Sequence, residues 1–139
     1  RAAVNPEREE ARHALEVAKR FAELRSVARL DACMELMHED ATLATLTYVV
    51  HGKHAMKVAL EDNQMLLHLG RFMGPWRYTV NNIEEMKHLN LGRKKAYCIE
   101  REGKQYRSFL WIDYRNFRIR ESCVVVDGKI RLYSIQQRL

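Results

Sequence analysis

Apolar residues in the first third of the chain recur every three or four positions, the spacing that gives an α-helix one buried side. The pattern predicts a first helix that begins at Pro6, with Asn5 as its N-cap. It predicts a second helix over residues 30–37 and a third over residues 53–67. The intervening residues 41–50 are rich in threonine and β-branched side chains, so we expect them to form a strand or a hairpin.

The rest of the chain has the composition of β-strands. Strands are predicted over residues 76–89, 94–101, 106–114, 117–126 and 130–137. The pairs Glu102-Gly103 and Asp127-Gly128 predict hairpin turns, the second more clearly, because Asp-Gly accepts the positive φ angles that such turns need. Helices followed by hairpin-linked strands indicate an α+β fold, in which the helices pack on one face of an antiparallel β-sheet.

Length and composition fit one globular domain. Of the 139 residues, 47% are hydrophobic and 30% are charged, which excludes a disordered or collagen-like chain. No linker or repeat divides the sequence, so we expect a single domain over residues 1–139, with residues 1–6 as an N-terminal tail. No apolar run approaches the ~18 residues of a membrane span, so no transmembrane segment is expected. The net charge of +6 bears on the choice of partners and not on the fold.

Three cysteines are present, and their number and spacing fit neither a disulfide framework nor a metal site. They are Cys33, Cys98 and Cys123. We expect buried free thiols, as in an intracellular protein of a reducing compartment. The chain begins at Arg1 instead of methionine, which the loss of an organellar transit peptide and a shortened chain explain equally well.

Three stretches resemble the nuclear-transport-factor-2-like superfamily in their order and spacing. Residues 30–43 (LDACMELMHEDATL) resemble the family's second helix, acidic pair and first strand, and residues 48–56 (YVVHGKHAM) resemble the entry to its third helix. Residues 126–130 (VDGKI) are similar to the turn before its last strand. The resemblance implies a curled antiparallel β-sheet wrapped by three N-terminal helices, which form a cystatin-like cone or roll around a cavity. It also implies frequent dimerisation through the outer sheet face. Its members include isomerases, polyketide cyclases, transport adaptors and assembly subunits, so the fold alone assigns no function.

The resemblance also implies where the chemistry of the ketosteroid-isomerase branch would lie. It matches Phe21 to a tyrosine on the first helix and Thr45 to a carboxylate base after the acidic pair. A phenylalanine cannot donate a hydrogen bond and a threonine is no base at neutral pH, so both catalytic parts are expected to be missing. We expect the nearby Asp40 to cap the end of the second helix.

Histidines near the first predicted strand raise the question of a metal. They are His38, His51 and His54, and no carboxylate lies beside them at the spacing of a zinc site. We therefore expect no metal, and the sequence carries no motif that calls for a cofactor.

An enzymatic alternative is a small-molecule lyase, isomerase or hydrolase of the polyketide-cyclase type. Asp113, in an apolar stretch, would then be the acid or base and Tyr48 the hydrogen-bond donor; otherwise Asp113 forms an ion pair with a neighbour such as Arg115 or Arg118. The expected pocket residues are Phe21, Thr45, Tyr48, Trp76 and Trp111. A third possibility is a pocket for an apolar ligand such as a lipid or pigment, whose lining would carry no charge.

The leading prediction is a non-catalytic interaction module, either a homodimer or an accessory subunit of a larger assembly. Residues 93–120 hold nine basic residues, three acidic residues and six aromatic residues. Arginines and aromatic residues anchor protein interfaces, whereas no signature of RNA binding accompanies them. We expect these residues on the outer sheet face, where they meet a protein partner with an acidic surface, or a second copy. The predicted interface residues are Tyr97, Arg101, Tyr106, Arg107, Phe117, Arg118 and Arg120.

Overall fold

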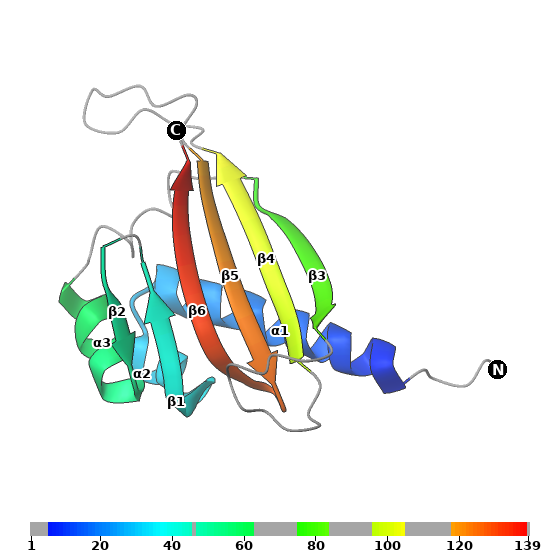
Figure 1. The fold of residues 1–139 in the computed structure, drawn as a ribbon, viewed down its shortest axis with the longest axis horizontal. Helices are drawn as coiled ribbons and strands as arrows, with labels where there is room; N and C mark the ends of the chain where they lie inside the picture. Colours follow the sequence, from blue (N-terminus) through cyan, green and yellow to red (C-terminus); the bar gives the residue numbers. More distant parts are fainter. Residues whose placement is uncertain (1–5, 46, 63–74, 84–95, 105–117, 139) are drawn as a thin grey trace.

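The structure is a computed structural model that describes residues 6–45, 47–62, 75–83, 96–104 and 118–138. Within these ranges the chain forms three helices and six strands (Figure 1). The helices are α1 (Pro6–Ser26), α2 (Leu30–Glu35) and α3 (Lys53–Asp62). The strands are β1 (Met37–Ala44), β2 (Val49–His51), β3 (Arg77–Ile83), β4 (Ala96–Lys104), β5 (Arg118–Val126) and β6 (Lys129–Arg138).

The six strands form one sheet in the order β2-β1-β6-β5-β4-β3. All neighbouring pairs are antiparallel except β1 and β6, which are parallel. The last strand thus lies between the N-terminal hairpin and the C-terminal meander, and joins them in one sheet. The predicted α+β class with three helices and a curled sheet is confirmed, with mixed instead of purely antiparallel pairing.

The two predicted hairpin turns have different outcomes. Asp127 (φ 50°) and Gly128 (φ 73°) form the turn between β5 and β6, because both accept left-handed backbone angles. The prediction of a turn at Glu102-Gly103 is wrong, since β4 continues through both residues and Gly103 pairs with Ile119. A Cβ at Gly103 would lie 2.8 Å from the ring of Trp76, so this glycine allows the indole to approach the backbone of the strand.

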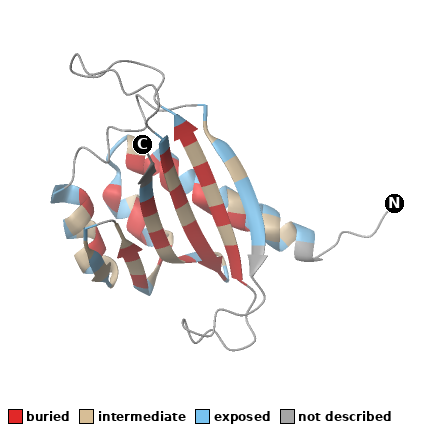
Figure 2. Cartoon of the chain, turned by 45° about the horizontal axis from the view of Figure 1, so that its top comes forward, coloured by how far each residue is buried: buried red, intermediate tan, exposed pale blue. Residues whose placement is uncertain are grey.

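The helices lie on one side of the sheet (Figure 1). α1 packs against β3, β4, β5 and β6, while α3 packs against β1 and β2. Residues along β4 and β5 alternate between this helix-facing side and the opposite side, which we call the open face (Figure 2). A small group of side chains is buried on the open face itself, namely Ala96, Val124 and Val126.

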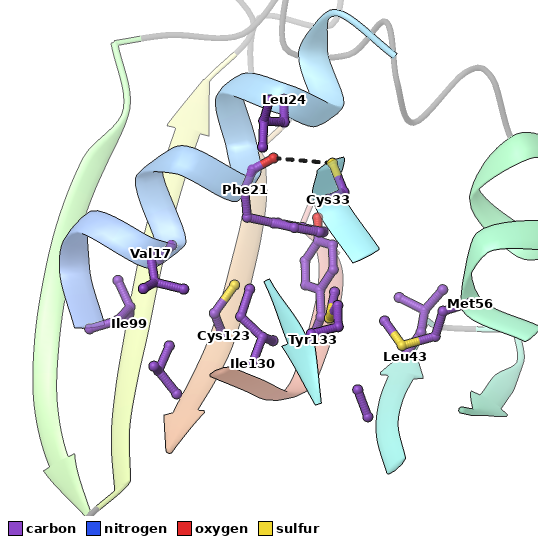
Figure 3. Close-up of a cluster of buried hydrophobic side chains, with 14 of the residues drawn as sticks. Val17, Phe21, Leu24, Cys33, Leu43, Met56, Ile99, Cys123, Ile130 and Tyr133 are labelled. Atoms are coloured by element: carbon purple, nitrogen blue, oxygen red, sulfur yellow. Dashed lines mark hydrogen bonds between the residues drawn. The ribbon is translucent and has the colours of Figure 1, made fainter. Parts of the chain in front are cut away.

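The main hydrophobic core fills the space between the helices and the sheet. Phe21 of α1 meets Tyr133 of β6 edge to face, with ring centroids 4.9 Å apart (Figure 3). The largest fully buried hydrophobic side chains around this pair are Met37, Leu43, Met56, Leu60, Ile99, Ile119 and Ile130.

The predicted boundary between the second helix and the first strand moves by several residues. α2 ends at Glu35 and β1 already begins at Met37, which pairs with Ile130. Asp40 therefore lies on β1 with an exposed side chain, and the prediction that it caps the helix is wrong.

The cysteines are free, and two of them are buried as predicted. Burial raises the pKa of Cys33 to about 11 and that of Cys123 to about 12. Both thiols therefore stay protonated at neutral pH and behave as small hydrophobic groups. Cys98 is half-buried on β4. Among the described helices, none has the length and apolar content that crossing a membrane requires.

Candidate functional site

Two arginines share one glutamate between α1 and the sheet. Glu121 of β5 accepts hydrogen bonds from Arg25 of α1 through Oε1 and from Arg101 of β4 through Oε2. The hydroxyl of Tyr133 donates to the same Oε1, at an O···O distance of 2.7 Å. The exposed fractions of Arg25, Arg101 and Glu121 are 4%, 9% and 7%, so water hardly reaches the carboxylate. Its hydrogen bonds come from three protein donors, the two arginines and the tyrosine.

The cluster fixes the charge of its carboxylate. Burial alone would raise the pKa of Glu121, but the charges and hydrogen bonds of Arg25 and Arg101 outweigh it and hold that pKa below the ordinary value. Burial would likewise lower the pKa of Arg101, whereas Glu121 and the side chain of Tyr78 raise it. Glu121 is thus ionised and fully hydrogen-bonded, which is unsuited to a general base, whose pKa should lie near the working pH.

This cluster was not predicted from the sequence, although the sequence carries a signal for it. Arg25 lies one helical turn after Phe21 on the apolar side of α1, and Glu121 lies between Ile119 and Cys123 on the helix-facing side of β5. A charged residue at a position that the hydrophobic pattern assigns to the core is seldom buried without a partner.

A pocket of about 370 Å³ opens beside the cluster, between α1 and strands β3 and β4. The guanidinium carbon of Arg101 lies 3.7 Å from the centroid of the Trp76 ring, a stacked cation–π contact. The ammonium of Lys19 lies 5.1 Å from the centroid of the Tyr78 ring. The lining residues are Lys19, Ala22, Glu23, Arg25, Ser26, Trp76, Tyr78 and Arg101.

The residues predicted to line one catalytic pocket lie in different places. Phe21 is packed in the core against Tyr133, and Trp76 lines the pocket beside Arg101. Thr45 closes the turn after β1, where its Oγ1 accepts the backbone N–H of Tyr48 at 3.1 Å. Tyr48 lines a separate, wider hollow against α3. Trp111 and Asp113 lie outside the described residues, so their place in the pocket stays a prediction.

The predicted outer-face interface is partly wrong. Tyr97 and Arg101 are buried on the helix-facing side, because the register of β4 turns the odd-numbered residues 97–103 toward α1. Arg118 and Arg120 do lie on the open face, where their guanidiniums are 3.7 Å and 3.2 Å from the carboxylate of Glu102. The other predicted interface residues, Tyr106, Arg107 and Phe117, lie outside the described residues.

The histidines of the N-terminal hairpin have polar protein partners. His51 Nδ1 is 2.9 Å from the hydroxyl of Thr42, and His38 Nδ1 is 2.9 Å from the guanidinium of Arg131. In the described part of the chain, no three His, Cys, Asp or Glu residues converge as metal ligands would.

The amino-acid sequence matches no protein-family model and no curated protein, whereas the fold matches solved structures. An NTF2-like protein with a cystatin-like fold from Novosphingobium aromaticivorans is 15% identical, with a TM-score of 0.56 over 91% of this chain and 80% of that one. A candidate polyketide cyclase from Sinorhizobium meliloti is 13% identical, with a TM-score of 0.51 over 87% of this chain and 94% of that one. A de novo designed protein with a curved β-sheet is 12% identical, with a TM-score of 0.54 over 91% and 86% of the two chains.

The chain therefore has the nuclear-transport-factor-2-like, cystatin-like fold, as the sequence resemblance predicted. This identification stops at the fold, because identities of 12% to 15% carry no activity from one chain to another. A designed protein shares the architecture, which also shows that the fold by itself assigns no function. The function therefore has to be argued from the residues of this chain.

Proposed function

We propose that this domain is a non-catalytic interaction module that binds an acidic surface of a protein partner through the open face of its sheet. The single observation that carries the proposal is the excess of positive charge at one end of that face. We call this group of side chains, Arg77, Lys104, Arg118 and Arg120, the basic end.

The register of the strands brings the basic end together. Arg77 pairs with Glu102, Glu102 pairs with Arg120, and Lys104 pairs with Arg118, so all five side chains lie on the open face. Glu100, two residues from Glu102, also lies on this face. Among the described side chains, the four cations and two carboxylates leave a net charge of +2 at this end of the sheet, which is the sign that attracts an acidic partner.

The charge of the basic end also bears on the kind of partner. Two copies of a net positive surface repel each other when they meet face to face, which disfavours a homodimer through this end of the sheet. A partner of opposite charge meets no such repulsion, which favours an accessory role beside that partner. The net charge of +6 for the whole chain acts in the same direction during the encounter.

The other side of the sheet supports a non-catalytic role. Hydrophobic side chains such as Phe21, Ile99 and Tyr133 form the core on the helix-facing side, and Glu121 is its only buried carboxylate among the described residues. Three donors hold that carboxylate ionised, so it is unavailable for proton transfer.

The proposal is tested with a fluorescently labelled poly-L-glutamate probe, whose binding to the purified chain is followed by anisotropy. The double variant Arg118→Gln/Arg120→Gln removes two cations from the basic end. Its matched control, Arg12→Gln/Arg20→Gln, removes two cations from the exposed side of α1, each of which also has one glutamate partner. We expect the first variant to weaken binding by about tenfold and the control by less than about twofold, with both effects shrinking as salt rises.

Equal losses in the two double variants would contradict the proposal, because they would show that only the total charge matters. Tighter binding of a single-stranded oligonucleotide than of the glutamate polymer would contradict it as well, since nucleic acid would then be the preferred anion.

A further inference from the structure

The pocket beside the arginine cluster carries more positive than negative charge. Arg25 and Arg101 share a single counterion, Glu121, and Lys19 adds a third cation at the pocket. The remaining acidic side chain is Glu23, which is 72% exposed and lies 3.7 Å from Arg20 on its own helix. Three cations against two carboxylates leave one positive charge that no described side chain balances.

One hydrogen-bond donor of the cluster also lacks an acceptor. Nη1 of Arg25 is buried, and it forms no hydrogen bond with any described group. Leaving a buried charged donor unsatisfied destabilises the fold, so such atoms commonly mark a place where a ligand or water completes the site.

Aromatic rings contact two of the three cations at the pocket. Trp76 stacks on the guanidinium of Arg101, and the ring of Tyr78 lies under Lys19. The glycine at position 103 makes the indole position possible, because any side chain there would collide with Trp76. The pocket lining thus combines two aromatic rings with three positively charged side chains.

We propose that this pocket binds a small organic carboxylate with a flat aromatic body, at Arg25, Arg101 and Lys19. A single carboxylate supplies the one missing negative charge, and its two oxygens suit the planar N–H groups of an arginine. An aromatic body can stack on the rings of Trp76 and Tyr78, which line the pocket. A volume of about 370 Å³ admits a ring with one carboxylate and short substituents.

Sodium benzoate is the probe, and isothermal titration calorimetry is the measurement. Benzamide is its neutral counterpart of the same shape, and acetate is the same charge without the ring. We expect benzoate to bind with a Kd of about 1 mM or below, and benzamide and acetate to bind at least about tenfold more weakly.

Two variants and a matched control locate the binding to the pocket. Lys19→Gln removes a pocket cation, and Trp76→Leu removes the aromatic wall; each is expected to weaken benzoate binding by about fivefold or more. Arg12→Gln removes a cation of the same helix that does not line the pocket and whose partner Glu9 does not line it either, so it should leave the Kd within about twofold.

Several results would overturn the proposal. Absence of saturable benzoate binding up to about 10 mM would exclude the site. Equal affinities for benzoate and benzamide would show that the pocket does not recognise the negative charge. Equal affinities for benzoate and acetate would show that it does not recognise the aromatic ring. Equal losses in Lys19→Gln and Arg12→Gln would indicate attraction by net charge alone.

Discussion

Replacing Glu121 by glutamine tests whether the arginine cluster has the electrostatic role that its geometry implies. The substitution keeps the size and shape of the side chain but removes the one counterion between Arg25 and Arg101. It also turns an N–H₂ group toward guanidinium donors that require an acceptor. The variant thus leaves two buried cations with no described carboxylate in contact.

The expected loss of stability follows from the burial of the three groups. Removing one partner of a buried ion pair costs about 3–5 kcal/mol, because the remaining charge stays desolvated. The hydroxyl of Tyr133 can still donate to the glutamine oxygen, which preserves one hydrogen bond worth about 1 kcal/mol. We therefore expect Glu121→Gln to lower the free energy of unfolding by about 3 kcal/mol or more.

Urea unfolding followed by circular dichroism measures this change, with Glu102→Gln as the control. Glu102 contacts Arg118 and Arg120 on the partly solvated open face, where an ion pair contributes about 0–1 kcal/mol. A loss below about 1 kcal/mol in Glu121→Gln, or equal losses in the two variants, would refute the claim that the buried cluster is held by its charge.

The pH dependence gives an independent check on the same variant. The pKa of Glu121 is lower in the folded chain than in the unfolded chain, so the unfolded chain binds a proton first as the pH falls. The stabilisation that ionised Glu121 contributes is therefore complete above the ordinary glutamate pKa of about 4.3. It is lost as the pH falls through the pKa that Glu121 has in the folded chain. The stability difference between the native chain and Glu121→Gln should be constant from about pH 6 to 8 and shrink in acid. A difference that does not shrink in acid would contradict the assignment.

Two further predictions concern the β5–β6 turn and the thiols. Gly128→Val should destabilise the fold by about 1–3 kcal/mol in the same urea assay, because φ is 73° and the new Cβ would lie 3.1 Å from His13 Nε2. Gly128→Asn, which accepts this φ more readily, should lose less, and an unchanged midpoint for the valine variant would contradict the turn. In the native chain the half-buried Cys98 should react with Ellman's reagent before the buried Cys33 and Cys123. Burial raises the pKa of Cys98 as well, but it raises the pKa of Cys33 to about 11 and that of Cys123 to about 12, and it also shields these two thiols from the reagent. Equal rates for all three thiols would refute this.

Local signals in the sequence were sufficient for much of the fold. The Asp127-Gly128 turn depends on two residues that accept positive φ, and the start of α1 at Pro6 depends on a residue suited to the first helical position. Such features need no information from distant parts of the chain. The same reasoning failed at Gly103, where the glycine makes room for Trp76, a contact between residues far apart in the sequence.

The candidate site was harder to predict because its parts come from different elements. Arg25 and Glu121 are 96 residues apart, and Arg101 reaches the same carboxylate from the neighbouring strand. Strand alternation indicates which residues share a face but not which face turns toward the helices. For that reason Tyr97 and Arg101 were assigned to the outer surface, although both are buried against α1.

Whether the open face is the binding surface is tested most directly by nuclear magnetic resonance of the native chain titrated with the glutamate polymer. The backbone amide signals of the basic end are expected to shift most, with Arg118, Arg120 and Glu102 at the centre of the perturbed region. Amides on the exposed side of α1, such as those of Arg12 and Arg20, should shift little at the same salt concentration. Shifts that are largest on α1, or that are spread evenly over all exposed cations, would contradict binding through the basic end of the sheet.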